Sequence, residues 1–188
     1  LNEYAYHFIR TLRQKPEVEE VILLVDELPD GQEYPQEPDL RIVPCWKFGA
    51  ADNSRRILGA VKAQKPDVVL FNIQFASFGS GKVPATLGLL APKLVKRAGF
   101  PTIVLLHNIM ETVDLKGAGF AGNPIADKVM RAAGTTVTKL LLGADLVAVT
   151  IPKYVEKLEA KYGAENVVLA PHGAFEESPE RAEFSRQR

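Results

Sequence analysis

Polar residues able to contact a ligand stand directly after three apolar runs in the second half of the chain. His107 and Asn108 follow PTIVLL, Thr150 follows ADLVAV, and His172 and Gly173 follow ENVVLAP. A helix-like stretch separates each pair of runs, so the runs predict strands of an open α/β sheet. In such a sheet the carboxyl ends of the strands face one crevice, where ligands bind. We therefore expect function along one rim that carries these five residues.

Each of these residues also has a structural interpretation. A single His is usually structural, and His172 lies in a Pro-His-Gly turn, where a turn or hinge role competes with ligand contact. Glu111 and Asp114 follow His107 in the same loop. Either carboxylate suits a general base, although exposed loop carboxylates commonly have no such role.

Metal and hydrolase chemistry find no support in the residue spacing. The histidines are scattered, and the chain has neither a cysteine pair nor a His-Glu-x-x-His motif. No Gly-x-Ser-x-Gly elbow marks a serine hydrolase. The single cysteine, Cys45, has no His or acidic residue beside it and is interpreted as a small apolar filler. We expect no metal and no internal disulfide, which fits a reducing compartment.

A second candidate site is the loop that begins at Gln74. Its segment Gly79-Ser80-Gly81-Lys82 resembles a phosphate loop, because glycines before a helix can present backbone N–H groups to an anion. The Walker pattern, however, needs a Gly where this chain has Ala76 and a Ser or Thr where it has Val83. The sequence therefore does not support a nucleotide phosphate loop.

We predict instead that this loop borders an acceptor pocket. It leaves the carboxyl end of the apolar run DVVLFNI and so opens into the same crevice as His107. Phe75 and Phe78 would offer ring faces to an acceptor, and Lys82 would add a positive charge near a helix N-terminus. The alternative is that both rings pack inward and Lys82 is solvated. The predicted substrate contacts are Gln74, Phe78, Gly79, Lys82, Asn108, Glu111 and Thr150.

The elements that must position these residues follow from the hydrophobic pattern. Val, Ile and Leu runs indicate strands, and apolar residues at helical spacing indicate helices between them. Pro44 is expected to end the second strand, Asn53 or Ser54 to cap the second helix, and Pro84 to open the third. The predicted strands are 19–28, 40–45, 67–73, 102–107, 144–150 and 165–170, and the predicted helices are 1–14, 55–64, 84–97, 125–142 and 151–163.

Composition limits the class of protein. The 188 residues include 46% hydrophobic and 24% charged residues, typical of a globular domain with a real core. The net charge is zero, so nothing indicates the basic surplus of a nucleic-acid binder. No run approaches the roughly 20 apolar residues of a membrane span. Because the chain opens on a helix, whereas doubly wound domains open on a strand, we expect a first strand and its loop upstream of Leu1.

The chain resembles a known family. The order Gln74–Gly79, helix, Pro101–Asn108, Ala144–Thr150 and Pro171–Gly173 is similar to the N-terminal domain of retaining GT-B glycosyltransferases. The resemblance is to the group that includes bacterial mannosyltransferases and sucrose-phosphate synthases, and it covers about residues 1–175. It implies one half of a GT-B fold: a Rossmann-like three-layer sandwich with a mostly parallel sheet.

The resemblance also implies different ligands for two domains. The N-terminal domain holds the carbohydrate, lipid or small-molecule acceptor, and an absent C-terminal domain binds the nucleoside diphosphate sugar without a metal. The residue at the position of His107 reaches the transferred sugar or its phosphate and is the expected catalytic residue. His172 and Gly173 lie where the chain crosses to the second domain, so residues 176–188 are expected to be a tail or linker. The expected location is cytoplasmic, either free or peripheral at the inner face of a membrane.

Two other functions stay open. A sugar-nucleotide epimerase can use the same GT-B scaffold, since a fold does not fix a reaction. A flavodoxin-like binding or regulatory domain would work alone, and would have a closed fold without an exposed apolar face between domains.

Overall fold

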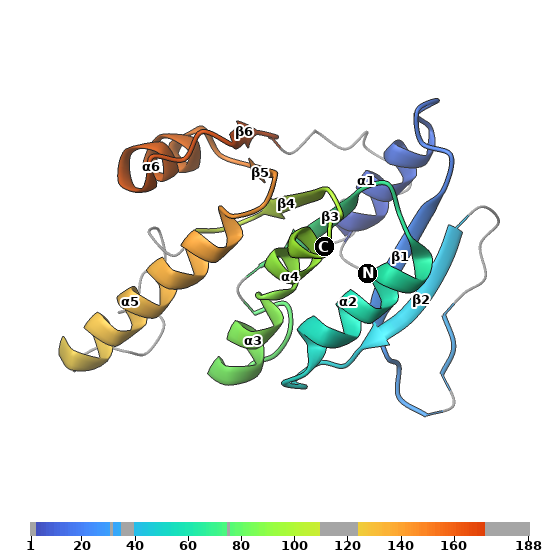
Figure 1. Cartoon of the computed structure of the whole chain (residues 1–188), viewed down its shortest axis with the longest axis horizontal. Coiled ribbons are helices and arrows are strands. Elements are labelled where there is room, and N and C mark those ends of the chain that lie inside the picture. Colours follow the sequence, from blue (N-terminus) through green and yellow to red (C-terminus); the bar gives the residue numbers. More distant parts are fainter. Residues whose placement is uncertain (1–2, 31, 35–39, 75, 110–123, 172–188) are drawn as a thin grey trace, which may run out of the picture.

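Strands and helices alternate along the chain, as the apolar runs predict (Figure 1). The computed structural model describes residues 3–30, 32–34, 40–74, 76–109 and 124–171. Their elements are, in chain order, α1 (Glu3–Arg13), β1 (Val21–Asp26), β2 (Leu40–Trp46), α2 (Asn53–Gln64), β3 (Val69–Ile73), α3 (Lys82–Gly88), α4 (Ala91–Arg97), β4 (Thr102–Leu106), α5 (Pro124–Leu141), β5 (Leu146–Val149), α6 (Pro152–Tyr162) and β6 (Val167–Leu169).

The strands pair in parallel throughout the described ranges. β3, β4, β5 and β6 form one sheet in that order, and β1 and β2 form a separate pair. Parallel strands joined by helices make the protein an α/β protein, and this confirms the coarse part of the predicted fold. The arrangement is compatible with a Rossmann-like fold.

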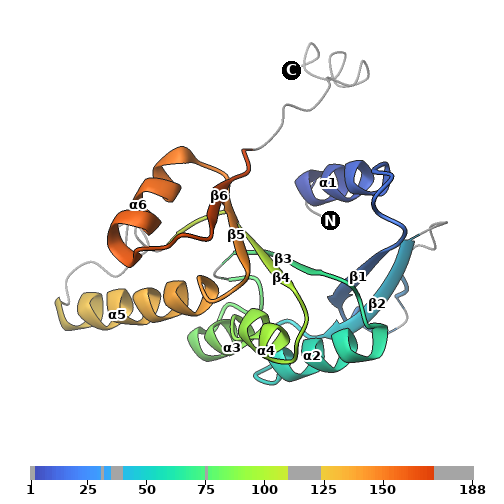
Figure 2. The same cartoon turned by 45° about the horizontal axis from the view of Figure 1, so that its top comes forward.

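Helices cover one face of the larger sheet much more fully than the other. Its connections all step in the same direction, and right-handed crossovers then place the connecting helices on one face. Figure 2 shows α2, α3 and α4 on one side of β3 and β4, and α1 on the other. The core lies under the connecting helices, and its side chains that are exposed by 1% or less include Val61, Val95, Val104, Leu106 and Leu158.

The alternation of side chains along β3 shows how unequal the two faces are. Val69, Phe71 and Ile73 face the core and are less than 10% exposed, whereas Leu70 between them is 38% exposed. Successive side chains of a strand point to opposite faces. The face away from α2 and α4 is therefore partly open at β3.

Three predictions about element ends are wrong, and each has a physical reason. The first concerns Pro44, which does not end β2 but lies inside it, opposite Val25. Among the described residues β2 is hydrogen-bonded only to β1, and the register shifts directly after Val25. An edge strand with a bulge tolerates a residue that cannot donate an N–H.

The second correction concerns the predicted helix 84–97, which is two helices. α3 begins at Lys82, before Pro84, and the chain starts a new helix, α4, at Ala91 with Pro92 in its first turn. In a continuous helix Pro92 would stand in the interior, where it removes a backbone hydrogen bond and clashes with the preceding turn. The break moves Pro92 to a position where its missing N–H costs nothing.

The third correction concerns the start of α2. Neither Asn53 nor Ser54 caps it: Asp52 holds the cap position and makes no side-chain cap hydrogen bond. The fully buried Asn53 amide instead brackets the preceding loop, where it accepts from the Lys47 N–H at 3.0 Å and donates to the Lys47 carbonyl at 2.8 Å. The side chain predicted to start the helix thus holds the β2–α2 loop.

The close packing of Gly88, at the end of α3, against Phe78 gives a prediction for stability. Gly88 lies against the ring of Phe78, so a Cβ at position 88 would come within 2.3–2.5 Å of that side chain. We expect Gly88→Ala to lower the free energy of unfolding by about 1–3 kcal/mol, as overpacking does. Gly59 in α2 is the matched control, because nothing lies within 4 Å of its added Cβ.

Gly59→Ala should raise the free energy of unfolding by roughly 0.5–1 kcal/mol, the gain of Ala over Gly inside a helix. Urea unfolding followed by circular dichroism measures both variants. Equal effects of the two substitutions would contradict the packing of α3 on Phe78.

Candidate functional site

The carboxyl ends of three neighbouring strands bring three of the predicted residues into one row. Ile73 of β3 is in register with Leu106 of β4, and Leu106 is in register with Val149 of β5. The next residue of each strand is Gln74, His107 and Thr150, respectively. The parallel sheet therefore places these three at one level along its rim, as the sequence predicts.

His107 is held by a side chain of the neighbouring strand. Its backbone N–H continues the ladder to the Ile73 carbonyl at 3.5 Å, and its Nε2 lies 2.5 Å from Oδ1 of Asn72. Because the amide oxygen accepts, this hydrogen bond assigns the proton of the neutral ring to Nε2. Asn72 thus helps to orient the imidazole.

Asn72 is a functional candidate that the sequence reasoning missed. It alternates with the buried Phe71 and Ile73 and is itself exposed, so it lies on the more open face of the sheet. The signal was present as an amide inside the otherwise apolar run VLFNI. A polar residue at one position of a buried parallel strand is unusual enough to mark it.

Asn108 brings an unsatisfied acceptor to the same rim. Its Oδ1 is buried and has no hydrogen-bond partner among the residues that the structure describes, while the next residue, Ile109, is fully buried and anchors the chain in the core. An unpaired buried polar atom costs about 1–3 kcal/mol. A hydroxyl or N–H donor of a ligand would remove that cost.

Thr150 closes the row at β5. It is 7% exposed and stands directly before the start of α6, where Ile151 holds the cap position and Pro152 the first turn. Its hydroxyl has little access to solvent. A ligand over His107 would therefore meet Thr150 at the margin of the site.

The loop after β3 is held in a defined conformation. The Gln74 N–H donates to Ser77 Oγ at 2.8 Å, and the Ser77 N–H donates to the Gln74 carbonyl at 3.1 Å. The Phe78 carbonyl accepts from the Gly49 N–H at 2.9 Å, which ties the loop to the one that follows β2. Gln74 is exposed at the start of this loop, as a substrate contact requires.

The structure places Phe78 and Gly79 in packing positions. Phe78 is 4% exposed and meets Trp46 edge to face, with ring centroids 5.4 Å apart. Its ring face is therefore covered by the protein, as in the inward-packing alternative. Gly79 has no positive φ, and its added Cβ would come within 3.2 Å of both Gly49 and Pro84. Because it has no side chain, Gly79 allows the two loops to approach each other closely.

Several predicted site residues lie outside the described part of the chain. Lys82 begins α3, but its side chain is among them. The others are Phe75, Glu111, Asp114, His172 and Gly173.

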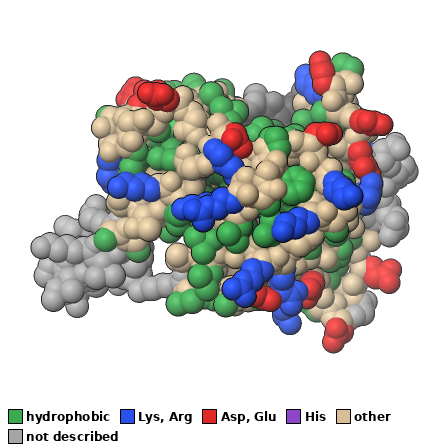
Figure 3. All heavy atoms as spheres, in the orientation of Figure 1, with side chains coloured by type: hydrophobic (Ala, Val, Ile, Leu, Met, Phe, Trp, Pro, Cys, Tyr) green, Lys and Arg blue, Asp and Glu red, His purple; other side chains and the backbone are tan. Residues whose placement is uncertain are grey.

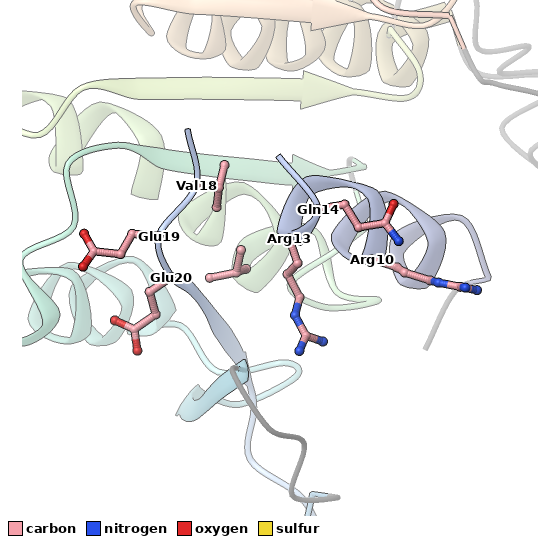
Figure 4. A pocket seen from close by; sticks show the side chains of 7 residues that line it. Arg10, Arg13, Gln14, Val18, Glu19 and Glu20 are labelled. Atoms are coloured by element: carbon pink, nitrogen blue, oxygen red, sulfur yellow. The ribbon is translucent and has the colours of Figure 1, made fainter. Parts of the chain in front are cut away.

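A hollow of about 280 Å³ lies at the other end of the strands. Figure 4 shows it between the carboxyl-terminal part of α1 and the segment that enters β1. Its charged lining is of mixed sign, and Glu20 is already engaged by Arg41 across 2.7 Å. The hollow is at the amino end of β1, whereas ligands of open α/β sheets bind at the carboxyl ends. Its lining residues are Arg10, Arg13, Gln14, Val18, Glu19, Glu20 and Val21.

The helical face carries mainly basic side chains. The helices α2, α3 and α4 contain no acidic residue, and Lys and Arg side chains gather over this face in Figure 3. Some are paired with acids of neighbouring segments: Arg56 with Glu27 at 2.6 Å and Lys96 with Asp145 at 3.1 Å. Arg56 and Lys96 thus lie on helices that cover the core.

Neither thiol nor metal chemistry is found in the described ranges. Cys45 is half-buried, and burial together with the nearby charge of Glu27 raises its pKa to about 11. The thiol is therefore protonated near neutral pH and acts as a filler, as predicted. No group of three His, Cys, Asp or Glu residues suited to a metal occurs in the part of the chain that the structure describes. Within that same part, every helix is too short or too polar to cross a bilayer.

No protein-family model matches the chain, and no curated protein matches it significantly.

The hydrogen bond between His107 and Asn72 gives a prediction for the site. In Asn72→Asp a carboxylate would replace the amide beside Nε2, and an opposite charge at this distance favours the imidazolium. We expect the pKa of His107 to rise by about 1 unit or more. NMR titration of the imidazole signals measures it.

Asn72→Leu is the control for this experiment, because it has similar volume but neither charge nor acceptor. It should not raise the pKa of His107, and the preference for the Nε2–H tautomer should weaken. An unchanged His107 pKa in Asn72→Asp would show that the two side chains are not in contact in solution.

Proposed function

We propose that this chain is the acceptor-side domain of a retaining GT-B glycosyltransferase, which transfers a sugar from a nucleoside diphosphate sugar to an acceptor hydroxyl. The observation that carries the proposal is the rim at which Gln74, His107 and Thr150 follow register-matched positions of three parallel strands. The proposal is supported by the order of the motifs along the chain and by the position of these three residues at the rim.

The rim has the groups that a polyhydroxyl ligand needs. The oriented His107 ring and the exposed amide of Gln74 offer hydrogen bonds at neighbouring positions. The buried Oδ1 of Asn108, which has no partner within the described ranges, can accept a further hydrogen bond. Sites built to hydrogen-bond a hydroxyl discriminate strongly against ligands that lack it, because the buried polar group then stays unpaired.

In the proposed reaction the acceptor hydroxyl oxygen bonds to the anomeric carbon while the bond from that carbon to the nucleoside diphosphate breaks, and the hydroxyl proton passes to the departing phosphate. Charge develops on the departing phosphate and on the sugar ring, and fixed donors stabilise such charge without reorganisation. His107 is the proposed catalytic residue, and Asn72 positions its ring. The donor would be held by a second domain, facing this rim across a cleft.

Activity of the intact enzyme tests the role of His107. We expect His107→Ala to lower kcat by about 10- to 1000-fold, the scale for the loss of one well-placed contact in a transition state. The measurement is sugar transfer from a labelled nucleoside diphosphate sugar, with circular dichroism to show that the variant folds.

Lys62→Ala is a suitable control, because Lys62 is exposed on α2, away from the rim. It should leave kcat unchanged. Wild-type rates in a folded His107→Ala protein would return His107 to a structural role and remove the residue on which the proposal rests.

A further inference from the structure

Acidic and basic residues are separated along the first half of the chain. Residues 17–39 hold nine acidic residues and no basic one, whereas residues 40–97 hold ten basic residues and two acidic ones. The net charge of the whole chain is zero, so the excess of one stretch nearly balances that of the other. Interspersed signs keep the field of a surface small, whereas separated signs build a large one. The separation therefore predicts one acidic and one basic surface.

The basic surface is formed by α2 and α4, which pack against each other. Neither helix contains an acidic residue, and Lys and Arg side chains gather over them in Figure 3. Pairing with neighbouring acids engages Arg56 and Lys96. We call the other basic side chains, which form no ion pair within the described ranges, the basic half; they are Lys62, Lys65, Lys93 and Arg97.

The acidic surface flanks β1. Glu17 and Glu19 precede this strand, and Asp30 and Glu33 follow it. All four side chains are exposed, and none of them belongs to an ion pair of the described residues. In Figure 3, Asp and Glu side chains line the side of the molecule on which Figure 1 shows β1 and β2. We call these four residues the acidic half.

Ion pairs mark the border at which the two halves meet. At the carboxyl end of β1, Arg56 of α2 contacts Glu27 at 2.6 Å. At the amino end, Arg41 contacts Glu20 at 2.7 Å and donates to Gln64 Oε1 at 3.0 Å. The helix α2 therefore lies alongside β1 and β2, and its last turn is beside the start of β1. The two halves are neighbours on one face of the molecule.

A patch with one basic and one acidic half is complementary to itself under a two-fold rotation. In a two-fold interface the same patch of both copies is used, and each contact occurs twice. An axis along the border places the basic half of each copy opposite the acidic half of the other. Lys62 and Lys65 end α2 at the same level at which Glu17 and Glu19 lead into β1. These two pairs of residues then face each other between the copies.

The acidic half also decides which partner fits the face. An anionic membrane or a nucleic acid would attract the basic half but would meet the like charge of the acidic half beside it. A second copy of this chain supplies both signs in the matching arrangement. Two copies do not repel each other as a whole, because a protein of zero net charge lacks the repulsion that keeps highly charged proteins apart.

We propose that this chain forms a two-fold dimer in which the basic half of each copy contacts the acidic half of the other. Single exposed ion pairs contribute little to stability, so the dimer depends on the summed field of each half. Complementary fields of this kind orient two partners and speed their encounter. The dimer is therefore weak and sensitive to salt, and its contacts between Lys62, Lys65 and the partner copy lie at the amino end of the sheet, away from His107.

Sedimentation velocity of this chain tests the dimer. At about 0.1 mM protein we expect dimers in about 0.05 M NaCl and an association constant at least ~10-fold lower in about 0.5 M NaCl, because salt screens exposed charges. Exchanging charges tests the two halves. Lys62→Glu with Lys65→Glu places acid against acid, and Glu17→Lys with Glu19→Lys places base against base. Each pair should lower the association constant at least ~10-fold, since juxtaposed like charges are costly.

The variant with all four substitutions restores opposite signs across the interface, so its association constant should return to within about 3-fold of the original value. Lys139→Glu, exposed on α5, is the matched control and should leave association unchanged. Circular dichroism shows whether each variant folds.

A chain that is monomeric at low salt would overturn the proposal, as would a four-residue exchange that fails to restore association in a folded protein. A monomer that binds vesicles of anionic phospholipid would overturn it in favour of a membrane as the partner of the basic half. None of these outcomes depends on His107, so the proposed function is tested separately.

Discussion

The rest of the structure depends on the in-register parallel pairing of β4 with β3 on one side and β5 on the other. At the amino ends the pairing is secured by Asp145, whose carboxylate accepts from the Thr102 N–H at 2.8 Å and pairs with Lys96 at 3.1 Å. The hydrogen bond from Thr102 and, to a lesser extent, the contact with Lys96 hold the pKa of this carboxyl below its ordinary value. The contribution of Asp145 to the free energy of unfolding is therefore present above the ordinary pKa and is lost as the pH falls through the lowered pKa. At the carboxyl ends the same register aligns Gln74, His107 and Thr150. A slip of one residue would turn His107 to the helical face and end its contact with Asn72.

The two faces of the sheet have different tasks. The helices α2, α4, α5 and α6 contribute to one core, and their outer surfaces carry charges that keep this side hydrated. Asn72 and the partly exposed Leu70 lie on the other face, where α1 is the described helix beside β3. A ligand site needs an accessible surface next to rigid elements, and this face provides it at the strand ends.

The sequence predicts much of this arrangement because apolar runs and helical spacing are local signals. The strands of the described ranges lie where the apolar runs predict them, whereas one predicted helix is two helices, and the runs before His107 and Thr150 end at neighbouring positions of one rim. Pro92 is a local signal for the break between α3 and α4, and the other failures depend on contacts that the hydrophobic pattern does not show. Pro44 is tolerated because β2 is an edge strand. The side chain of Asn53 hydrogen-bonds the backbone of Lys47 instead of capping α2. Phe78 packs on Trp46, which lies far away in sequence. Asn72 is marked in the sequence as an amide within an apolar run, but its partner His107 is identified only by the structure. Local patterns do not encode such pairings.

The central claim is that ligands bind at the carboxyl rim around His107. The most direct measurement is a ¹H–¹⁵N NMR spectrum of this chain, recorded while a mixture of neutral monosaccharides and sugar phosphates is added at millimolar concentration. The account predicts concentration-dependent shifts that centre on Gln74, His107, Asn108 and Thr150, and smaller shifts in the Asn72→Leu variant. Shifts that centre instead on Arg10, Arg13 and Glu20, around the hollow at the amino end of β1, would contradict it, as would a spectrum that does not change.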